Sequence, residues 1–425
     1  MKILIVSNSP WRNDNSFGNS YTNIFEGIPD IEIANIFCKY GNPQTTVASR
    51  FFQITEKSLI KNFLKKTPSG REVFLEKTCI EESNDGVELF NIARKQKTQL
   101  MFWLRDIIWK FGRWKSKELV DFVDDFKPDL IFQPVYFSSH ITNIARFIKK
   151  HTDVPMVGYI SDDCYTLRQF SLSPLYWVDR LFKRRMVKRT IEQCEILYVI
   201  SDIQKAEYEK IFTPPCKILT KCADFSGEAP NIKISDNEIR MVYAGNISKG
   251  RGESLSYITQ AIERLNNEGY NVLLDIYSGT PVTDKLSENL SRKGCYFHGK
   301  VTYSEVQNIE QNADILIHVE GLSLKERLAV HQSFSTKLVD FFEMGKCIFA
   351  VGSYDEAFAK HLIDNDAAVV ATNKEQVYIK LKELIENRDL ITEYGKKAYD
   401  CGKKHHNKAD VQGMLREDLM RISTK

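Results

Sequence analysis

The chain has 425 residues, of which 43% are hydrophobic and 27% are charged. This length is too great for a single hydrophobic core, so we expect two domains. The formal net charge of +3 gives no support for a nucleic-acid partner, and no apolar run reaches the length of about 18 residues that a membrane-spanning helix needs. Nine scattered cysteines without a C-x-x-C pair indicate reduced thiols, and we expect a cytoplasmic protein.

The first expected element is a buried strand at residues 1–7, followed by a polar loop at residues 8–19. Ligands of doubly wound sheets bind at the carboxyl ends of strands, so this loop is expected beside a ligand. Gly18 allows close approach of the backbone, and Arg12 is suited to face an anion. The alternative is a surface loop without a ligand. A helix is expected from Ser20.

Residues 45–122 are expected to be mostly helical, because regular alternation of strands is missing there. Within them, residues 102–115 carry Trp103, Trp109 and Trp114 together with Arg105, Lys110, Arg113 and Lys115. Aromatic rings and cations on one helix suit the interface of a bilayer, where the rings lie at headgroup depth. The alternative is a helix whose aromatic side chains pack on the core of the domain.

Short apolar segments then alternate with helices, at residues 128–132, 154–160 and 196–201. This alternation is typical of a parallel sheet built from βαβ units. Polar residues with Gly and Pro at 226–237 indicate a linker. A second alternating series follows it, with strands expected near 239–244, 271–276, 295–297, 314–318, 347–351 and 367–370. We therefore expect α/β domains at residues 1–230 and 237–405.

The first strand of the second series runs into a loop punctuated by glycine, and a helix follows the loop. The loop contains Gly245 and Asn246 and two cations, Lys249 and Arg251. Such a loop at a strand end is suited to meet an anionic group, although solvated surface charges are the alternative.

Residues 333–350 show a related pattern. A turn of small residues, ending in Thr336 and Lys337, opens an apolar-patterned helix, and Gly345 ends the helix before a buried strand. Free backbone N–H groups and the helix dipole favour an anion at such a start, and Lys337 adds a full charge. Asp340, one turn further along, is suited to accept hydrogen bonds from a diol such as ribose. Phosphate beside ribose indicates a nucleotide diphosphate, whereas the alternative is an ordinary αβ unit with a glycine stop.

The order and spacing of these two segments resemble the donor-binding motifs of GT-B glycosyltransferases of the retaining family 4 type. The resemblance implies two Rossmann-like domains that face a central cleft, with a helical insertion in the first domain at about 45–122. It also implies that the last helix, at residues 406–425, returns to the first domain. The first domain would bind the acceptor and the second the nucleotide sugar.

The resemblance assigns further roles. The segment 297–301 resembles a turn whose backbone contacts the nucleobase, which makes His298 a candidate donor-binding residue. Asp162 and Asp163 stand where family members place polar residues near the acceptor, with a helix N-cap as the alternative for one of them. Family members typically carry a Glu-x7-Glu pattern, and here Gln332 and Asp340 stand at its two positions. Glu320 is therefore a candidate carboxylate near the donor sugar, although it is equally suited to an exposed loop.

Together these features predict a retaining transferase that moves a sugar from a nucleotide-diphosphate sugar to a hydroxyl of a glycan or lipid-linked glycan. No convincing Asp-x-Asp metal site is present, so Arg251 and Lys337 are expected to balance the leaving diphosphate, with no metal and no cofactor. The resemblance implies a role in bacterial polysaccharide synthesis, with a weak contact to the inner leaflet of the membrane. The alternatives are a GT-B nucleotide-sugar epimerase and a non-catalytic nucleotide-sugar-binding or scaffold protein.

Overall fold

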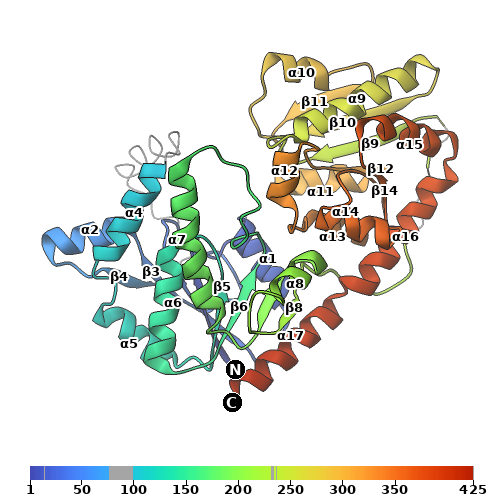
Figure 1. Ribbon diagram of the computed structural model, residues 1–425. Coiled ribbons are helices and arrows are strands. Elements are labelled where there is room, and N and C mark those ends of the chain that lie inside the picture. The colour runs from blue at the N-terminus through green and yellow to red at the C-terminus, as the bar shows by residue number, and fades with distance from the viewer. Residues whose placement is uncertain (14, 76–98, 231–233, 236, 425) are drawn as a thin grey trace.

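The structure is a computed structural model that describes residues 1–13, 15–75, 99–230, 234–235 and 237–424. The side chains of residues 99–102 and of residue 303 also lie outside the description, so the expectation for Phe102 is not addressed. The chain forms two α/β domains, each built on its own sheet, and the domains contact each other (Figure 1).

The first domain holds an eight-stranded sheet in the order β4-β3-β2-β1-β5-β6-β7-β8. Its strands are β1 (Lys2–Ser7), β2 (Glu32–Phe37), β3 (Arg50–Ile54), β4 (Gly70–Val73), β5 (Leu130–Pro134), β6 (Met156–Ile160), β7 (Leu197–Val199) and β8 (Cys216–Ile218). The helices that its described residues form are α1 (Ser16–Phe25), α2 (Glu56–Lys65), α4 (Gln99–Phe111), α5 (Lys117–Phe126), α6 (Ser139–Thr152), α7 (Pro174–Ile191) and α8 (Asp202–Tyr208). Strands such as β1 are continuous apolar runs because helices cover both faces of the sheet.

The expected helical insertion at about 45–122 needs correction, because this segment also extends the sheet. Strand β3 pairs in parallel with β2, and β4 pairs antiparallel with β3 at the edge of the sheet. Both strands are short, and only α2 lies between them. The sequence therefore shows no regular alternation of strands here, and that lack is what led to the helical expectation. Helices α2, α4 and α5 account for the helical part of the segment.

The second domain holds a six-stranded parallel sheet in the order β11-β10-β9-β12-β13-β14. Its strands are β9 (Ile239–Ala244), β10 (Val272–Tyr277), β11 (Cys295–Gly299), β12 (Ile315–Val319), β13 (Cys347–Val351) and β14 (Val369–Ala371). Its helices are α9 (Arg251–Asn267), α10 (Asp284–Leu290), α11 (Tyr303–Gln311), α12 (Leu324–Val330), α13 (Lys337–Met344), α14 (Ala357–Asp364), α15 (Lys374–Glu386) and α16 (Asp389–His405). Each strand lies within two residues of its expected bounds.

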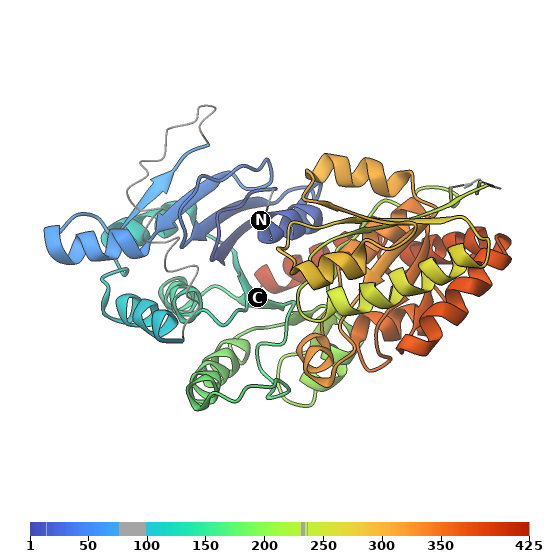
Figure 2. The same ribbon diagram turned by 90° about the horizontal axis from the view of Figure 1, so that it is seen from above.

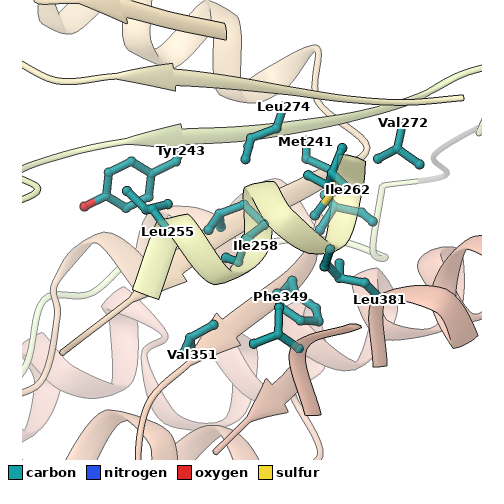
Figure 3. Close-up of a cluster of buried hydrophobic side chains, with 14 of the residues drawn as sticks. Met241, Tyr243, Leu255, Ile258, Ile262, Val272, Leu274, Phe349, Val351 and Leu381 are labelled. Atoms are coloured by element: carbon teal, nitrogen blue, oxygen red, sulfur yellow. The ribbon is translucent and has the colours of Figure 1, made fainter. Parts of the chain in front are cut away.

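Two apolar clusters hold the second domain together, one on each face of its sheet. Figure 3 shows the cluster in which α9 lies on the sheet, with Ile258 and Ile262 packed among side chains such as Leu274 and Phe349. On the other face, α13, α14 and α16 pack on the same strands. Helix α13 ends at Gly345, whose φ of +61° is a left-handed conformation that glycine adopts without strain. Both loops that carry the donor motifs are therefore fixed to a rigid frame.

The chain crosses between the domains twice. The first crossing follows β8, and the second joins α16 to the last helix, α17 (Lys408–Ser423). Helix α17 lies on the sheet of the first domain, where Leu415 and Leu419 are fully buried among residues of β1 and α1. The two crossings are joined, because the Ala223 N–H donates to the His406 carbonyl at 2.9 Å and the Lys408 N–H donates to the Ala223 carbonyl at 2.8 Å. Figures 1 and 2 show α16 and α17 as the red arm that connects the domains.

Candidate donor site

The loops that follow β9 and β12 pack against each other because these strands are neighbours in the sheet. Two glycines allow this contact. Gly250 has a φ of +79°, and a Cβ there would lie 2.9 Å from the Gly321 Cα. A Cβ on Gly321 would in turn lie 2.7 Å from the Lys249 carbonyl oxygen. The close approach places Arg251, the first residue of α9, beside Glu320 at the end of β12.

Arg251 and Glu320 form a two-pronged ion pair. The guanidinium Nε lies 2.9 Å from Oε2 of Glu320, and Nη2 lies 2.6 Å from Oε1. The Glu320 side chain is 7% exposed and that of Arg251 is 24% exposed. Two of the five guanidinium N–H groups are used in this way, so the partly exposed remainder can donate to an incoming anion. The pair therefore presents positive charge to solvent while neutralising a buried carboxylate.

Two further titratable groups lie in the protein interior near this pair. Glu356 is fully buried, and its Oε2 accepts a hydrogen bond of 2.6 Å from the Ser353 N–H. Burial, with a smaller contribution from the Glu320 charge, raises the pKa of Glu356 to about 8. His318 on β12 is buried against Phe358, and its burial, with a smaller effect of the Arg251 charge, lowers its pKa to about 3. Both groups are therefore neutral near pH 7, which leaves Glu320 as the buried carboxylate that faces Arg251.

The start of α13 combines a cation with free backbone donors. The Lys337 ammonium donates to the Ala244 carbonyl at the end of β9 and lies 3.5 Å from the Glu310 carboxylate. Thr336 is the N-cap residue but makes no capping bond with its side chain. Within the part of the chain that the structure describes, no acceptor takes the N–H groups of Ser335 and Thr336. An anion at this helix start would meet both the dipole and a full charge.

Asp340 is held by a lysine from the other domain. The Lys221 ammonium, which lies on the segment after β8, donates to Oδ1 of Asp340. The Lys221 side chain is only 10% exposed, whereas that of Asp340 is 28% exposed. The contact bridges the domains, and one edge of Asp340 remains open to a ligand.

A pocket of about 260 Å³ opens between these elements. Its lining includes Gly245 from the β9 loop, Tyr277 from the end of β10, Lys300, Glu310, Lys337 and Asp340. The structure thus brings together Gly245, Lys337 and Asp340, which the sequence assigns to donor binding. Burial raises the pKa of Glu310 even though Lys337 lies beside it. The pocket therefore has a mixed lining of cations, carboxylates and one aromatic ring, as a nucleotide requires.

The remaining expected donor residues lie around this pocket or on the adjoining loop. His298 stacks on the pocket residue Tyr277, with ring centroids 4.7 Å apart, and its Nε2 lies 2.6 Å from Asp275. Asn246 is exposed, and its Oδ1 accepts a hydrogen bond of 2.7 Å from the Ser248 N–H. Lys249 is exposed in a left-handed conformation, with a φ of +57°.

Three expected residues belong to the first domain and are not part of this pocket. Gly18 is buried in α1, where a Cβ would lie 2.0 Å from the Arg12 carbonyl oxygen, so the glycine lets the loop pack on the helix. Asp162 is exposed, and its Oδ1 accepts a hydrogen bond of 3.3 Å from the Ser333 hydroxyl of the second domain. Asp163 is buried instead, and its carboxylate accepts bonds from the N–H groups of Tyr165 and Thr166 at 3.0 and 2.7 Å.

The carboxylate of Asp163 is engaged by further groups of its own domain. Arg180 lies 3.5 Å from its carboxylate, and the Tyr208 hydroxyl donates to it at 3.4 Å. All these partners belong to the first domain, so Asp163 fixes the turn after β6. The next helix, α7, starts at Pro174 with Ser173 as its N-cap, so Asp163 is not a helix N-cap; Asp162 is the residue of the pair that faces the second domain.

Gln332, at the first position of the Glu-x7-Glu pattern, lies in the contact between the domains. Its Nε2 donates to Oε2 of Glu207 on α8 at 2.6 Å, and its carbonyl accepts a hydrogen bond of 2.7 Å from the Ser201 hydroxyl. His331 lies 3.2 Å from the same Glu207 carboxylate, which Arg168 also contacts. An amide is suited here because a second carboxylate would repel Glu207.

Sequence reasoning missed Lys221, Glu310 and Glu356. Lys221 follows a short strand within Thr-Lys-Cys and shows no motif of its own. Glu310 is the second-last residue of α11 and stands in a pattern typical of a surface helix. Glu356 sits at the N-cap position of α14, where an acidic residue has an ordinary structural meaning. Only the packing of distant segments brings these three groups to the site.

The comparisons with known proteins bear on the fold. No family model and no curated protein sequence matches the chain. Solved structures match it over nearly their whole length. HepE of Anabaena in complex with UDP has a TM-score of 0.64 at 11% identity, covering 99% of this chain and 100% of that one.

Two further structures agree with this match. Sucrose-phosphate synthase from Thermosynechococcus elongatus has a TM-score of 0.63 at 10% identity, covering 99% of each chain. WaaG, a glycosyltransferase involved in lipopolysaccharide biosynthesis, has a TM-score of 0.56 at 12% identity, also covering 99% of each chain. At these identities the likeness establishes the architecture. The chain therefore has the GT-B glycosyltransferase fold, with two Rossmann-like domains.

Proposed function

We propose that the protein is a retaining glycosyltransferase of the family 4 type, which moves a hexosyl group from a nucleotide-diphosphate sugar to a hydroxyl of a glycan or lipid-linked glycan. One observation carries the proposal. Lys337 and the carboxylate of Asp340 line a single pocket at the carboxyl end of the second sheet, and within the described residues no acceptor takes the N–H groups of Ser335 and Thr336, which directly precede Lys337. These are groups that bind a diphosphate and a diol side by side. The GT-B fold supports the proposal, and HepE was solved in complexes with UDP and with UDP-glucose.

The chemistry follows from the charges. Cleavage of the bond between the sugar and the diphosphate leaves negative charge on the diphosphate oxygens, which fixed donors must stabilise. Arg251 offers its unpaired N–H groups, and Lys337 offers its ammonium. Lys221 adds a third positive charge near Asp340. We infer that these cations do the work a metal does in other transferases, so the reaction needs no metal and no cofactor beyond the sugar nucleotide.

The acceptor would enter from the first domain. Asp162 is the exposed carboxylate at the end of β6, and it reaches the Ser333 hydroxyl just before α13. We infer that it positions an acceptor hydroxyl beside the donor pocket. Glu320 is buried next to Arg251 and would act at the donor-sugar end of the site. Asp163 would act only through the turn that it fixes.

The test begins with a panel of UDP-, GDP- and ADP-sugars. A binder is identified by the rise in melting temperature, and its conversion with polysaccharide and lipid-linked acceptors is followed by NMR of the anomeric proton. We expect one nucleotide sugar to raise the melting temperature and to yield a product that keeps the anomeric configuration. Arg251→Ala should weaken nucleotide diphosphate binding about ten- to a hundred-fold, as expected for a lost charge-assisted hydrogen bond. Unchanged binding in this variant would refute the placement of the site.

The position of Gln332 favours one second candidate. Its amide is committed to the contact with Glu207 and α8, so the first carboxylate of the family pattern is replaced by a structural group. A protein that binds a nucleotide sugar without transferring it would show the same pocket. Binding by calorimetry without any transfer or hydrolysis over the whole acceptor panel would support this candidate.

A further inference from the structure

Helix α7 exposes an unusual number of large apolar side chains. Leu175, Val178 and Phe182 are 53%, 44% and 65% exposed, and their spacing of three and four residues places them on one side of the helix. Leu172, just before the helix, is 87% exposed. Exposed Arg185 and Lys188 continue the helix at its carboxyl end. An isolated exposed apolar residue needs no explanation, but an ordered stripe of them beside cations marks an interaction surface.

Two neighbouring helices carry matching stripes. The one on α4 consists of Leu104, Ile107 and Phe111, and the one on α2 consists of Ile60, Phe63 and Leu64. The indole N–H of Trp109 on α4 donates to Glu56 on α2 at 2.9 Å, and that of Trp103 donates to Asp179 on α7 at 3.1 Å. Helix α4 is thus tied to both of the others. We call the exposed stripes of α2, α4 and α7 the three-helix face; Figure 1 shows α2 at the outer edge of the first domain, with α4 and then α7 following in the direction of the second domain.

The tryptophans that suggest a membrane contact in the sequence have a different role. Trp109 is 2% exposed and stacks on His140, and Trp114 is 8% exposed within the core of the domain. With Trp103 bonded to Asp179, all three hold α4 in place. The exposed part of α4 is its aliphatic stripe and Phe111, which the sequence pattern does not single out.

The three-helix face is also strongly basic. Its helices contain eleven basic and three acidic residues. Seven of the basic residues are exposed, namely Lys57, Lys61, Lys65, Lys110, Arg185, Lys188 and Arg189. Arg180 is buried beside Asp163 and adds nothing to this exposed charge. The three acidic residues are all held within the domain. Glu56 and Asp179 bond to the tryptophans, and Asp106 accepts from the Ser139 hydroxyl at 3.0 Å. The exposed charge of these helices is therefore positive, and it lies next to apolar side chains.

We propose that the three-helix face docks on the surface of a bilayer that contains anionic lipid. Apolar side chains on the flanks of separate helices can enter the headgroup region one by one, while lysine and arginine meet lipid phosphates. None of the helices in the described part of the chain is long and apolar enough to span a bilayer, and the proposed contact is peripheral. Each basic residue contributes little at such a surface, so binding is reversible and sensitive to salt.

The proposal is tested with the full chain and vesicles of phosphatidylcholine alone or with 30% phosphatidylglycerol (about a physiological anionic fraction), by co-sedimentation at low and high salt. We expect binding to the anionic vesicles at low salt, a loss of at least fivefold at high salt, and little binding to phosphatidylcholine. The double variant Leu172→Glu and Phe182→Glu should reduce binding at least tenfold. Both side chains are largely exposed, so the fold should be retained, and an unchanged melting temperature checks this.

A matched control is available on the second domain, where Ile379 on α15 is 62% exposed. Ile379→Glu makes the same kind of change outside the three-helix face and should leave vesicle binding unchanged. The double variant should keep its affinity for nucleotide diphosphate, which separates this proposal from that of the donor site. Absence of binding to anionic vesicles at low salt would overturn the proposal and leave an acidic protein as the partner of the face. Equal binding by the wild type and the double variant would overturn it as well.

Discussion

Replacing Glu320 by glutamine should tighten the binding of nucleotide diphosphate while slowing sugar transfer. In the free protein, Glu320 takes two N–H groups of Arg251 and cancels much of the positive charge that Arg251 presents. A diphosphate bound on the far side of the guanidinium would be repelled by this carboxylate. Glutamine has the same shape and no charge, so the repulsion disappears and Arg251 stays in place.

The size of the effect can be worked out from the arrangement. Two unit charges about 7 Å apart interact with about 2 kcal/mol at an effective dielectric constant of about 20. Solvent at the partly exposed Arg251 lowers this to about 1 kcal/mol, which corresponds to about fivefold tighter binding. Transfer should fall by about a hundredfold if the carboxylate stabilises positive charge at the donor sugar.

Isothermal titration calorimetry with nucleoside diphosphates measures the first effect, and turnover with the nucleotide sugar measures the second. Glu253→Gln is the matched control, because this residue lies in the first turn of α9 and is exposed, with its carboxylate bonded to the Tyr257 hydroxyl at 2.6 Å. Water screens the charge of Glu253, so the affinity of this variant for nucleoside diphosphate should differ from that of the wild type by less than about twofold. An affinity for Glu320→Gln that is weaker than that of the wild type would refute the reasoning.

Other outcomes follow from the same geometry. Lys337→Ala should weaken nucleotide diphosphate binding about ten- to a hundred-fold by calorimetry, since it removes the cation at the start of α13; unchanged affinity would contradict this. Lys221→Met should free Asp340 and weaken the contact between the domains, which small-angle scattering detects as a larger radius of gyration, whereas an identical radius would argue against the bridge. Transfer should continue in EDTA, and complete loss that manganese restores would show that the fixed cations are insufficient. Because the pKa of Glu356 is raised to about 8 from an ordinary 4.5, the stability that its neutral form contributes is present below pH 4.5 and is lost as the pH rises towards 8. Urea unfolding of wild type and Glu356→Gln should therefore diverge by up to about 1.4 kcal/mol per pH unit in this window, and parallel profiles would rule the titration out.

The architecture of the second domain could be predicted from the sequence because its strands are short, mostly apolar runs between helices, of which β12, β13 and β14 are buried throughout. A segment such as Cys347–Val351 is apolar at every position, so it is suited to a buried strand and not to a surface element. Strand β3 and the edge strand β4 were missed in the first domain because they are short and separated by α2. Strand pairing at an edge depends on contacts with a distant strand, which a local pattern does not contain.

The donor site was only partly predictable, for a related reason. Lys337 and Asp340 share one helix start, so local spacing places them together. Lys221 reaches Asp340 from a position 119 residues earlier in the chain, and no spacing rule connects the two. The acidic pair after β6 shows the limit most clearly. Asp162 and Asp163 are equivalent in sequence, but the fold turns one towards the second domain and fixes the other inside a turn.

The hydrogen-bonded junction of the two crossings has a mechanical consequence. Two covalent connections that met the second domain at separate points would resist both bending and twisting. Here they run side by side at Ala223 and His406, so both pass through nearly one point. Such a junction is suited to be a hinge, about which the second domain would swing as a rigid body while its internal packing stays intact. The hydrogen bonds between the domains, such as those of Gln332 to Glu207 and Ser333 to Asp162, would have to break in such a swing. In the proposed transferase they would form a latch that opens and closes as the donor and the acceptor enter.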